Sequence, residues 1–212
     1  MTVLVTGYEP FGDHEANPTE SIAGDLDGTT VAGHDVVGAV LPVAFDEVAA
    51  ELTALLDAHD PEAVVATGVA GGRQAVAVER VGVNVADCAG VPDNDGAEPR
   101  GVHPADGPDA YLSTLPVGET VRACLDAGVP ARVSNTAGTH CCNRALYALL
   151  HALDRRNRDV PAGFVHVPLT PGRAAAETDP DAAASAGSVP PSLPLSASRR
   201  AVEVAFETAL SA

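Results

Sequence analysis

The sequence predicts an α/β protein, a three-layer α/β/α sandwich with a central mixed, mostly parallel sheet. The prediction rests on short apolar runs of strand length, on helical stretches between them, and on Gly or Pro at the junctions. Strands that alternate with helices in this way are typical of a parallel core. The 212 residues fit a single domain covering 1–212, with no internal repeat and no second core.

The N-terminal half is expected to alternate strands and helices. Its strands are brief apolar runs, and its first helix opens near Pro18, a residue suited to the first helical turn. In chain order these elements are a strand at 2–7, a helix at 17–26, a strand at 35–43, a helix at 45–58 and a strand at 62–68. Residues 74–88 alternate apolar and polar side chains and are expected to form a strand or hairpin, followed by an irregular segment at 92–108.

The C-terminal half continues the alternation. Its clearest helix begins near Thr139, because leucines then recur at i, i+3, i+4 and i+7, at positions 146, 149, 150 and 153. The other elements, in order, are a helix at 117–127, a strand at 131–135, a strand at 162–168 and a helix at 199–210. Residues 172–196 are rich in Ala, Ser, Pro and Gly and are expected to form a loop.

The charge balance limits the partners. The chain has 29 acidic residues against 12 basic ones, all arginine, and a formal net charge of −17. Nucleic acid is therefore not an expected partner, because phosphate binding needs a basic face. An acidic chain without lysine is typical of a halophilic protein, since concentrated salt screens self-repulsion; a merely acidic protein is the alternative. With neither a long apolar run nor a signal-like start, we expect no membrane association and a cytoplasmic location.

Four cysteines lack any C-x-x-C pairing, so we expect reduced thiols and no metal site. Two of them, Cys141 and Cys142, are adjacent in "SNTAGTHCCN" (134–143), at the start of the leucine helix. Unpaired backbone N–H groups and the helix dipole are expected to lower a thiol pKa there and favour the reactive thiolate. These considerations leave open which of the two sulfurs is the nucleophile.

A cysteine nucleophile needs a base, usually histidine. His166 lies in an apolar strand near its carboxyl end, where α/β folds place their sites, although a satisfied core histidine would look the same. The other six lie in polar loops, on outward helix faces, on the leucine helix or too near the cysteines along the chain; they are His14, His34, His59, His103, His140 and His151.

Several motifs, taken in order, carry a family resemblance. They are "VLVTGYEPFG" (3–12) with "NP" (17–18), "GVAGGR" (68–73), "ERVGVN" (79–84), "PDN" (92–94), "YLSTLP" (111–116), "SNTAGTHCCN" (134–143) and "GFVHVP" (163–168). Together they resemble the pyroglutamyl peptidases, a family of cysteine peptidases, over nearly the whole chain. The resemblance implies that Cys142 is the nucleophile, that His166 is its base and that Glu79 orients His166. It also implies that Cys141 packs as a small hydrophobe. Without it, Glu79 would be taken for a solvated surface carboxylate.

The resemblance implies an omega-peptidase that removes an N-terminal pyroglutamyl residue from small peptides, without metal or organic cofactor. A 5-oxoproline ring is uncharged, so its pocket needs apolar walls and a few hydrogen bonds. The expected substrate-binding residues are Tyr8, Phe11, Asn17, Val69 and Val91. Asn17 is expected to tie the first loop to the site or to cap the helix at Pro18. The family also implies a homo-oligomer, either a tetramer or a dimer.

The chain departs from the family pattern before "PDN". Relatives carry an active-site Arg there, whereas this chain reads "ADCAGVPDN" (86–94), with one extra residue and no Arg. Losing such a charge costs about 2–4 kcal/mol unless it is replaced. The candidate replacements are Arg73, Arg100 and the backbone N–H groups at the helix start. Val69 also stands where relatives often carry a polar residue.

These departures leave two rival functions open. One is a hydrolase of another lactam or small amide. The other is a non-catalytic binder of blocked N-termini on the same scaffold.

Overall fold

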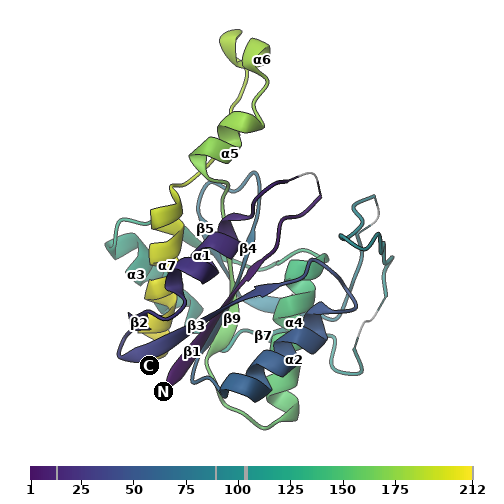
Figure 1. Ribbon diagram of the computed structural model, residues 1–212, viewed down its shortest axis with the longest axis vertical. Coiled ribbons are helices and arrows are strands. Elements are labelled where there is room, and N and C mark those ends of the chain that lie inside the picture. Colours follow the sequence, from purple (N-terminus) through teal and green to yellow (C-terminus); the bar gives the residue numbers. More distant parts are fainter. Residues whose placement is uncertain (13, 89, 103–104, 212) are drawn as a thin grey trace.

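A seven-stranded sheet forms the centre of the protein (Figure 1). The structure is a computed structural model that describes residues 1–12, 14–88, 90–102 and 105–211. In spatial order the strands are β2 (Thr30–Val31), β3 (His34–Leu41), β1 (Thr2–Tyr8), β4 (Val64–Val69), β9 (Ala162–Val167), β5 (Val76–Glu79) and β8 (Ala131–Ser134). β3, β1, β4 and β9 run parallel, whereas β2 is antiparallel to β3 and β5 to β9. The predicted mixed, mostly parallel sheet is confirmed.

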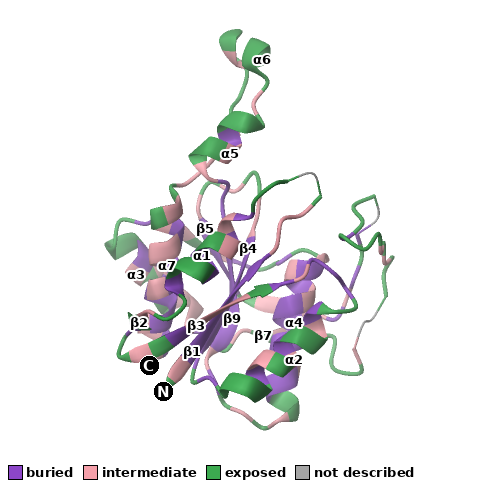
Figure 2. Ribbon diagram, in the orientation of Figure 1, coloured by how far each residue is buried: buried purple, intermediate pink, exposed green. Residues whose placement is uncertain are grey.

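Helices cover both faces of this sheet, which gives the predicted three layers (Figure 1). One face is covered by α1 (Pro18–Leu26), α3 (Val117–Asp126) and α7 (Leu195–Ala209), and the other by α2 (Val48–His59) and α4 (Cys141–Arg155). Buried residues concentrate where these helices meet the sheet (Figure 2). Within the described residues, no helix combines the length and the apolar character that a bilayer span requires.

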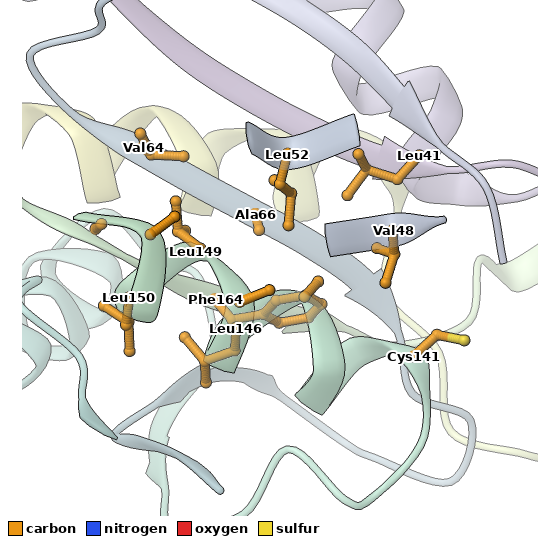
Figure 3. Close-up of a cluster of buried hydrophobic side chains, with 14 of the residues drawn as sticks. Leu41, Val48, Leu52, Val64, Ala66, Cys141, Leu146, Leu149, Leu150 and Phe164 are labelled. Carbon is orange, nitrogen blue, oxygen red and sulfur yellow. The ribbon is translucent and has the colours of Figure 1, made fainter. Parts of the chain in front are cut away.

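The core under α2 and α4 fixes the helix that carries the two cysteines. Leu52 of α2 and Leu146 and Leu149 of α4 gather around Phe164 of β9, and all four are fully buried (Figure 3). Cys141 lies at the end of the same cluster. Because the leucine face of α4 is held in this core, its first turn is held beside the carboxyl ends of the central strands.

Residues 74–88 form neither one strand nor a hairpin, so that expectation is wrong. β5 belongs to the main sheet, whereas β6 (Val81–Val83) pairs with β7 (Ala110–Leu112) in a separate two-stranded sheet. A Cβ at Gly82 would lie 3.0 Å from both the Leu146 Cγ and the Tyr147 backbone nitrogen. The chain therefore leaves the main sheet after β5 and passes closely over α4, which an alternating pattern does not reveal.

The expected loop at 172–196 contains helical turns, so that expectation is partly wrong. α5 (Pro171–Ala176) and α6 (Pro180–Ala184) stand away from the body (Figure 1), and α7 begins at Leu195 instead of residue 199. Thr170 and Asp179 cap the two short helices and are each followed by proline. A capping residue followed by Pro is a helix-start signal that the Ala- and Ser-rich composition obscured.

Candidate active site

A cavity of about 410 Å³ opens beside the first turn of α4, at the carboxyl ends of β1, β4 and β9. It brings together most of the predicted site residues. The lining residues are Tyr8, Phe11, Asn17, Val43, Val69, Ala70, Gly71, Arg73, Ala137, Gly138, His140, Cys141, Cys142 and His166. Glu79 lies behind His166, fully buried, while Val91 is absent from the lining.

The start of α4 separates the two adjacent cysteines. His140 is the extended N-cap residue, and the helix begins at Cys141. Successive helical side chains point about 100° apart, so the neighbouring sulfurs face different surroundings. Cys141 is 1% exposed and belongs to the apolar core, whereas Cys142 is partly exposed beside His166 in the cavity lining. The packing of α4 therefore favours Cys142 as the accessible thiol.

Glu79 and His166 form a buried pair. The His166 Nδ1 lies 2.8 Å from the Glu79 Oε1, and Glu79 is 0% exposed. Because a carboxylate oxygen only accepts hydrogen bonds, Nδ1 carries the proton and donates it to this bond. The Nε2 atom is then the ring nitrogen left to exchange protons. A solvated surface position for Glu79, the alternative raised by its local sequence, is wrong because β5 lies inside the sheet between β9 and β8.

The charges of this pair follow from burial and hydrogen bonding. Burial raises the pKa of Glu79, but its interactions with His166, Ser134 and Arg73 outweigh this effect, so the pKa lies below its ordinary value. Burial also lowers the pKa of His166, and the hydrogen bond to Glu79 only partly opposes this. At neutral pH the site therefore holds a carboxylate and an uncharged imidazole.

The Cys142 thiol is neutral as well, so the expected lowering of its pKa is wrong. Burial raises the pKa of Cys142 to about 12, and the negative charge of Glu79 acts in the same direction. The positive charge of Arg73 and a backbone hydrogen bond oppose this rise without overcoming it. Among the described residues no hydrogen bond joins the Cys142 sulfur to His166. The resting pair is therefore a thiol and a neutral base that line the same cavity.

Tyr8, the last residue of β1, and Phe11 line the cavity next to the start of α4. The Tyr8 hydroxyl donates a hydrogen bond of 2.7 Å to the Cys141 carbonyl oxygen, which ties the end of β1 to the first turn of α4. The Phe11 ring meets the His140 ring edge-on at 5.3 Å between centroids. Val69 ends β4 at the same wall. Flat apolar faces and a few fixed polar atoms suit a small uncharged ring.

Asn17 caps α1, which is one of its two expected roles, and it also binds the loop after β1. Its Oδ1 accepts from the Thr19 N–H at 3.0 Å as the N-cap of α1, and its Nδ2 donates to the Glu9 carbonyl at 3.0 Å. Asn17 thus joins the loop after β1 to the start of α1.

Val91 is the predicted binding residue that the structure does not bring into the cavity. Val91 is 48% exposed, and its carbonyl oxygen accepts a hydrogen bond of 3.1 Å from the His140 Nε2. The position carried over from the family pattern therefore does not line the cavity in this chain. Contact with the cavity is instead made through His140.

The remaining histidines mostly lie where the sequence suggests. His34 is the exception, because it begins β3 instead of lying in a loop, and its Nε2 lies 2.8 Å from the Glu62 carboxylate. His103 lies outside the described residues. His140, set aside as a base because of its nearness to Cys142, does line the cavity, with its ring between Phe11 and Phe45.

Sequence reasoning missed two buried polar residues that shape the site. Asn143, next to Cys142, accepts from the Val83 N–H and donates to the carbonyls of Val83 and Val85, which attaches β6 to the start of α4. Asp93 accepts from the Phe45 N–H at 2.8 Å. Both residues fall inside the motifs "SNTAGTHCCN" and "PDN". Their place in those motifs was the available signal.

Of the two arginines considered as replacements for the missing Arg, only Arg73 reaches the site. It lines the cavity, and its Nη1 lies 2.7 Å from the Glu79 Oε1. Arg100 pairs with Glu98 instead, with a side chain that is 63% exposed. Across the described part of the chain, no group of three or more His, Cys, Asp or Glu side chains is arranged to hold a metal ion.

Comparisons with known proteins agree over the full length of the chain. The family model described as pyroglutamyl peptidase matches residues 1–212. The chain is 45% identical over 210 residues to a pyrrolidone-carboxylate peptidase of Escherichia fergusonii, covering 99% of this chain and 92% of that protein. It is 40% identical over 212 residues to one from Pyrococcus furiosus, covering 99% and 98%. A solved mutant pyrrolidone carboxyl peptidase from Pyrococcus furiosus matches with a TM-score of 0.92 and 38% identity, over 100% of this chain and 99% of that one.

Proposed function

Because the chain belongs to the pyroglutamyl peptidase family, we propose that its cavity takes an N-terminal 5-oxoprolyl residue and that Cys142, His166 and Glu79 cleave it from the peptide. The observation that carries this proposal is the chemistry of the cavity wall. Among the described residues that line it, none is Asp or Glu, and most are apolar or aromatic. A free α-amino group would need an anionic partner there, whereas an uncharged lactam does not.

The arrangement supports nucleophilic catalysis. The Cys142 sulfur attacks the carbonyl carbon of the 5-oxoprolyl residue, and its proton passes to the His166 Nε2. The resulting imidazolium is stabilised by Glu79, which accepts from Nδ1 at 2.8 Å. His166 then gives the proton to the departing amine nitrogen as the C–N bond breaks, leaving a thioester on Cys142. Water, deprotonated by His166, hydrolyses the thioester and releases pyroglutamate.

The developing oxyanion needs hydrogen-bond donors. The first backbone N–H groups of α4 have no partner within the helix, and Cys142 lies in this turn. They supply the positive end of the helix dipole next to the attacked carbonyl. This role suits the backbone better than Arg73, whose Nη1 and Nη2 already bind Glu79 and the Thr136 carbonyl.

The decisive test is release of a fluorescent amine from pyroglutamyl-aminocoumarin. Wild type, Cys141→Ser and Cys142→Ser are compared with a reductant in molar KCl, because the acidic, lysine-free composition suggests adaptation to salt. Turnover is expected to survive the first substitution and to vanish with the second. Prolyl-aminocoumarin, which carries a charged ring amine, is the matched substrate control and is expected to remain intact.

Other outcomes would point elsewhere. Turnover by Cys142→Ser would refute the assignment of the nucleophile. A folded wild type that cleaves other lactams but not this substrate would support the hydrolase of different specificity. Tight binding of a pyroglutamyl peptide without turnover would support the binder.

The cellular setting is part of the same proposal. The enzyme would act in the cytoplasm on small peptides, as a dimer or tetramer. Light scattering in molar KCl measures the oligomeric state directly, and a monomeric mass at assay concentration would contradict the expected assembly.

A further inference from the structure

Arg73 shares one carboxylate oxygen with His166. The Arg73 Nη1 lies 2.7 Å and the His166 Nδ1 2.8 Å from the same Glu79 Oε1. The Arg73 Nη2 also donates to the Thr136 carbonyl at 3.2 Å, which fixes the guanidinium between β5 and the loop before α4. The Arg73 side chain is 18% exposed and lines the cavity. Among the described lining residues, it is the one whose side chain is positively charged at neutral pH.

A carboxylate as buried as Glu79 requires a positive partner. Two groups can provide one: the permanent charge of Arg73, or a proton taken up by His166. If His166 took up that proton in the resting state, it would no longer accept one from Cys142. The presence of Arg73 on the same oxygen removes the need for a charged imidazole.

The other titratable groups near His166 agree with Arg73 being the positive partner of Glu79. Glu79 acts on His166 from β5, and Arg73 acts from the segment between β4 and β5. Cys142 of α4 shares the cavity with His166, and Tyr8 of β1 lies close enough to be influenced by Cys142. The thiol and the phenol are neutral at pH 7, because burial raises the pKa of both. Arg73 is therefore the charge that balances Glu79.

We propose that Arg73 is a positioning residue whose charge neutralises Glu79 and so keeps His166 an uncharged base in the resting enzyme. The proposal rests on the proposed function for its catalytic meaning. The effect of the Arg73 charge on the protonation of His166 can be measured without a substrate. Alkylation of Cys142 depends on the same exchange of a proton between Cys142 and His166.

The test replaces Arg73 by two neutral residues and by one charged residue. Arg73→Met removes charge and hydrogen bonds, Arg73→Gln retains donors without the charge, and Arg73→Lys retains the charge. Arg80→Met is the matched control, because Arg80 is exposed and its Nη1 binds the Asn135 side chain at 2.8 Å. For each variant, kcat/KM for pyroglutamyl-aminocoumarin and the rate of Cys142 alkylation by iodoacetamide are measured against pH. Mass spectrometry identifies the alkylated cysteine.

Loss of a nearby positive charge makes proton loss from the Cys142 and His166 pair more difficult. The acid limb is the low-pH side of each profile, where kcat/KM or the alkylation rate rises with pH. It is therefore expected to move to higher pH by about one unit in Arg73→Met and Arg73→Gln. It should stay at the wild-type position in Arg73→Lys and Arg80→Met. The two neutral variants provide independent measurements, so poor folding of one does not prevent the test.

Two results would overturn the proposal. One is an acid limb that coincides with wild type in the neutral variants. The other is lower thermal stability without any shift of the limb, which would make Arg73 a structural clamp only. The outcomes for the proposed function are separate: an alkylation limb that shifts in a protein without peptidase activity would support the role of Arg73 and refute the activity.

Discussion

Replacing Gly68 by alanine is expected to impair the peptidase activity more than it impairs the fold. A Cβ at this position would lie 2.8 Å from the Cys142 Sγ and 2.9 Å from the Phe164 Cζ, both closer than ordinary van der Waals contact. Phe164 is fully buried among the leucines of α2 and α4, so its ring has little room to withdraw. Cys142 faces the cavity, so its sulfur is the atom that moves.

The magnitudes follow from this geometry. Overpacking of a filled site costs about 1–3 kcal/mol of unfolding free energy. In a chain of this length, each kcal/mol lowers Tm by roughly 2–4 °C. A reacting atom displaced by about 1 Å loses roughly 100-fold in rate. The expected variant is therefore folded, moderately less stable and severely impaired in kcat.

The assay combines kcat for pyroglutamyl-aminocoumarin with thermal unfolding followed by circular dichroism. Gly24→Ala is the matched control, because Gly24 lies inside α1 with no heavy atom within 4 Å of its added Cβ. That variant should keep its activity and gain about 1 kcal/mol, since alanine favours a helix over glycine. Wild-type kcat and Tm in Gly68→Ala would refute the reasoning that the nucleophile is held against β4.

Two further predictions concern Tyr8 and Glu79. Tyr8→Phe keeps the ring but removes the hydrogen bond to the Cys141 carbonyl, so urea unfolding should show a loss of about 0.5–1.5 kcal/mol, and equal stability would contradict the proposed tie between β1 and α4. The pKa of Glu79 lies below its ordinary value, so its contribution to stability is fully present above the unfolded-state pKa and is lost as pH falls through the folded-state pKa. The stability gap between wild type and Glu79→Gln should therefore narrow below about pH 5, and a gap that is independent of pH would refute a buried carboxylate at position 79.

The sequence determined the elements that carry the proposed nucleophile and the proposed base. The leucine periodicity after Thr139 predicted α4, and the apolar run that contains His166 predicted β9. The motifs also indicated the family and distinguished Cys142 from Cys141. These features depend on neighbours a few residues apart, so they can be recognised without the rest of the fold.

Only the tertiary structure decided how the site is charged. Glu79 and His166 lie 87 positions apart in the chain, and Arg73 joins them through a third segment. Their pairing, and the burial that raises the pKa of Cys142 in spite of the helix N-terminus, depend on how β5, β9 and α4 come together. Val91 turned away from the cavity, and residues 74–88 divided between two sheets, for the same reason. Burial and electrostatic interaction depend on distance in space, which local periodicity does not specify.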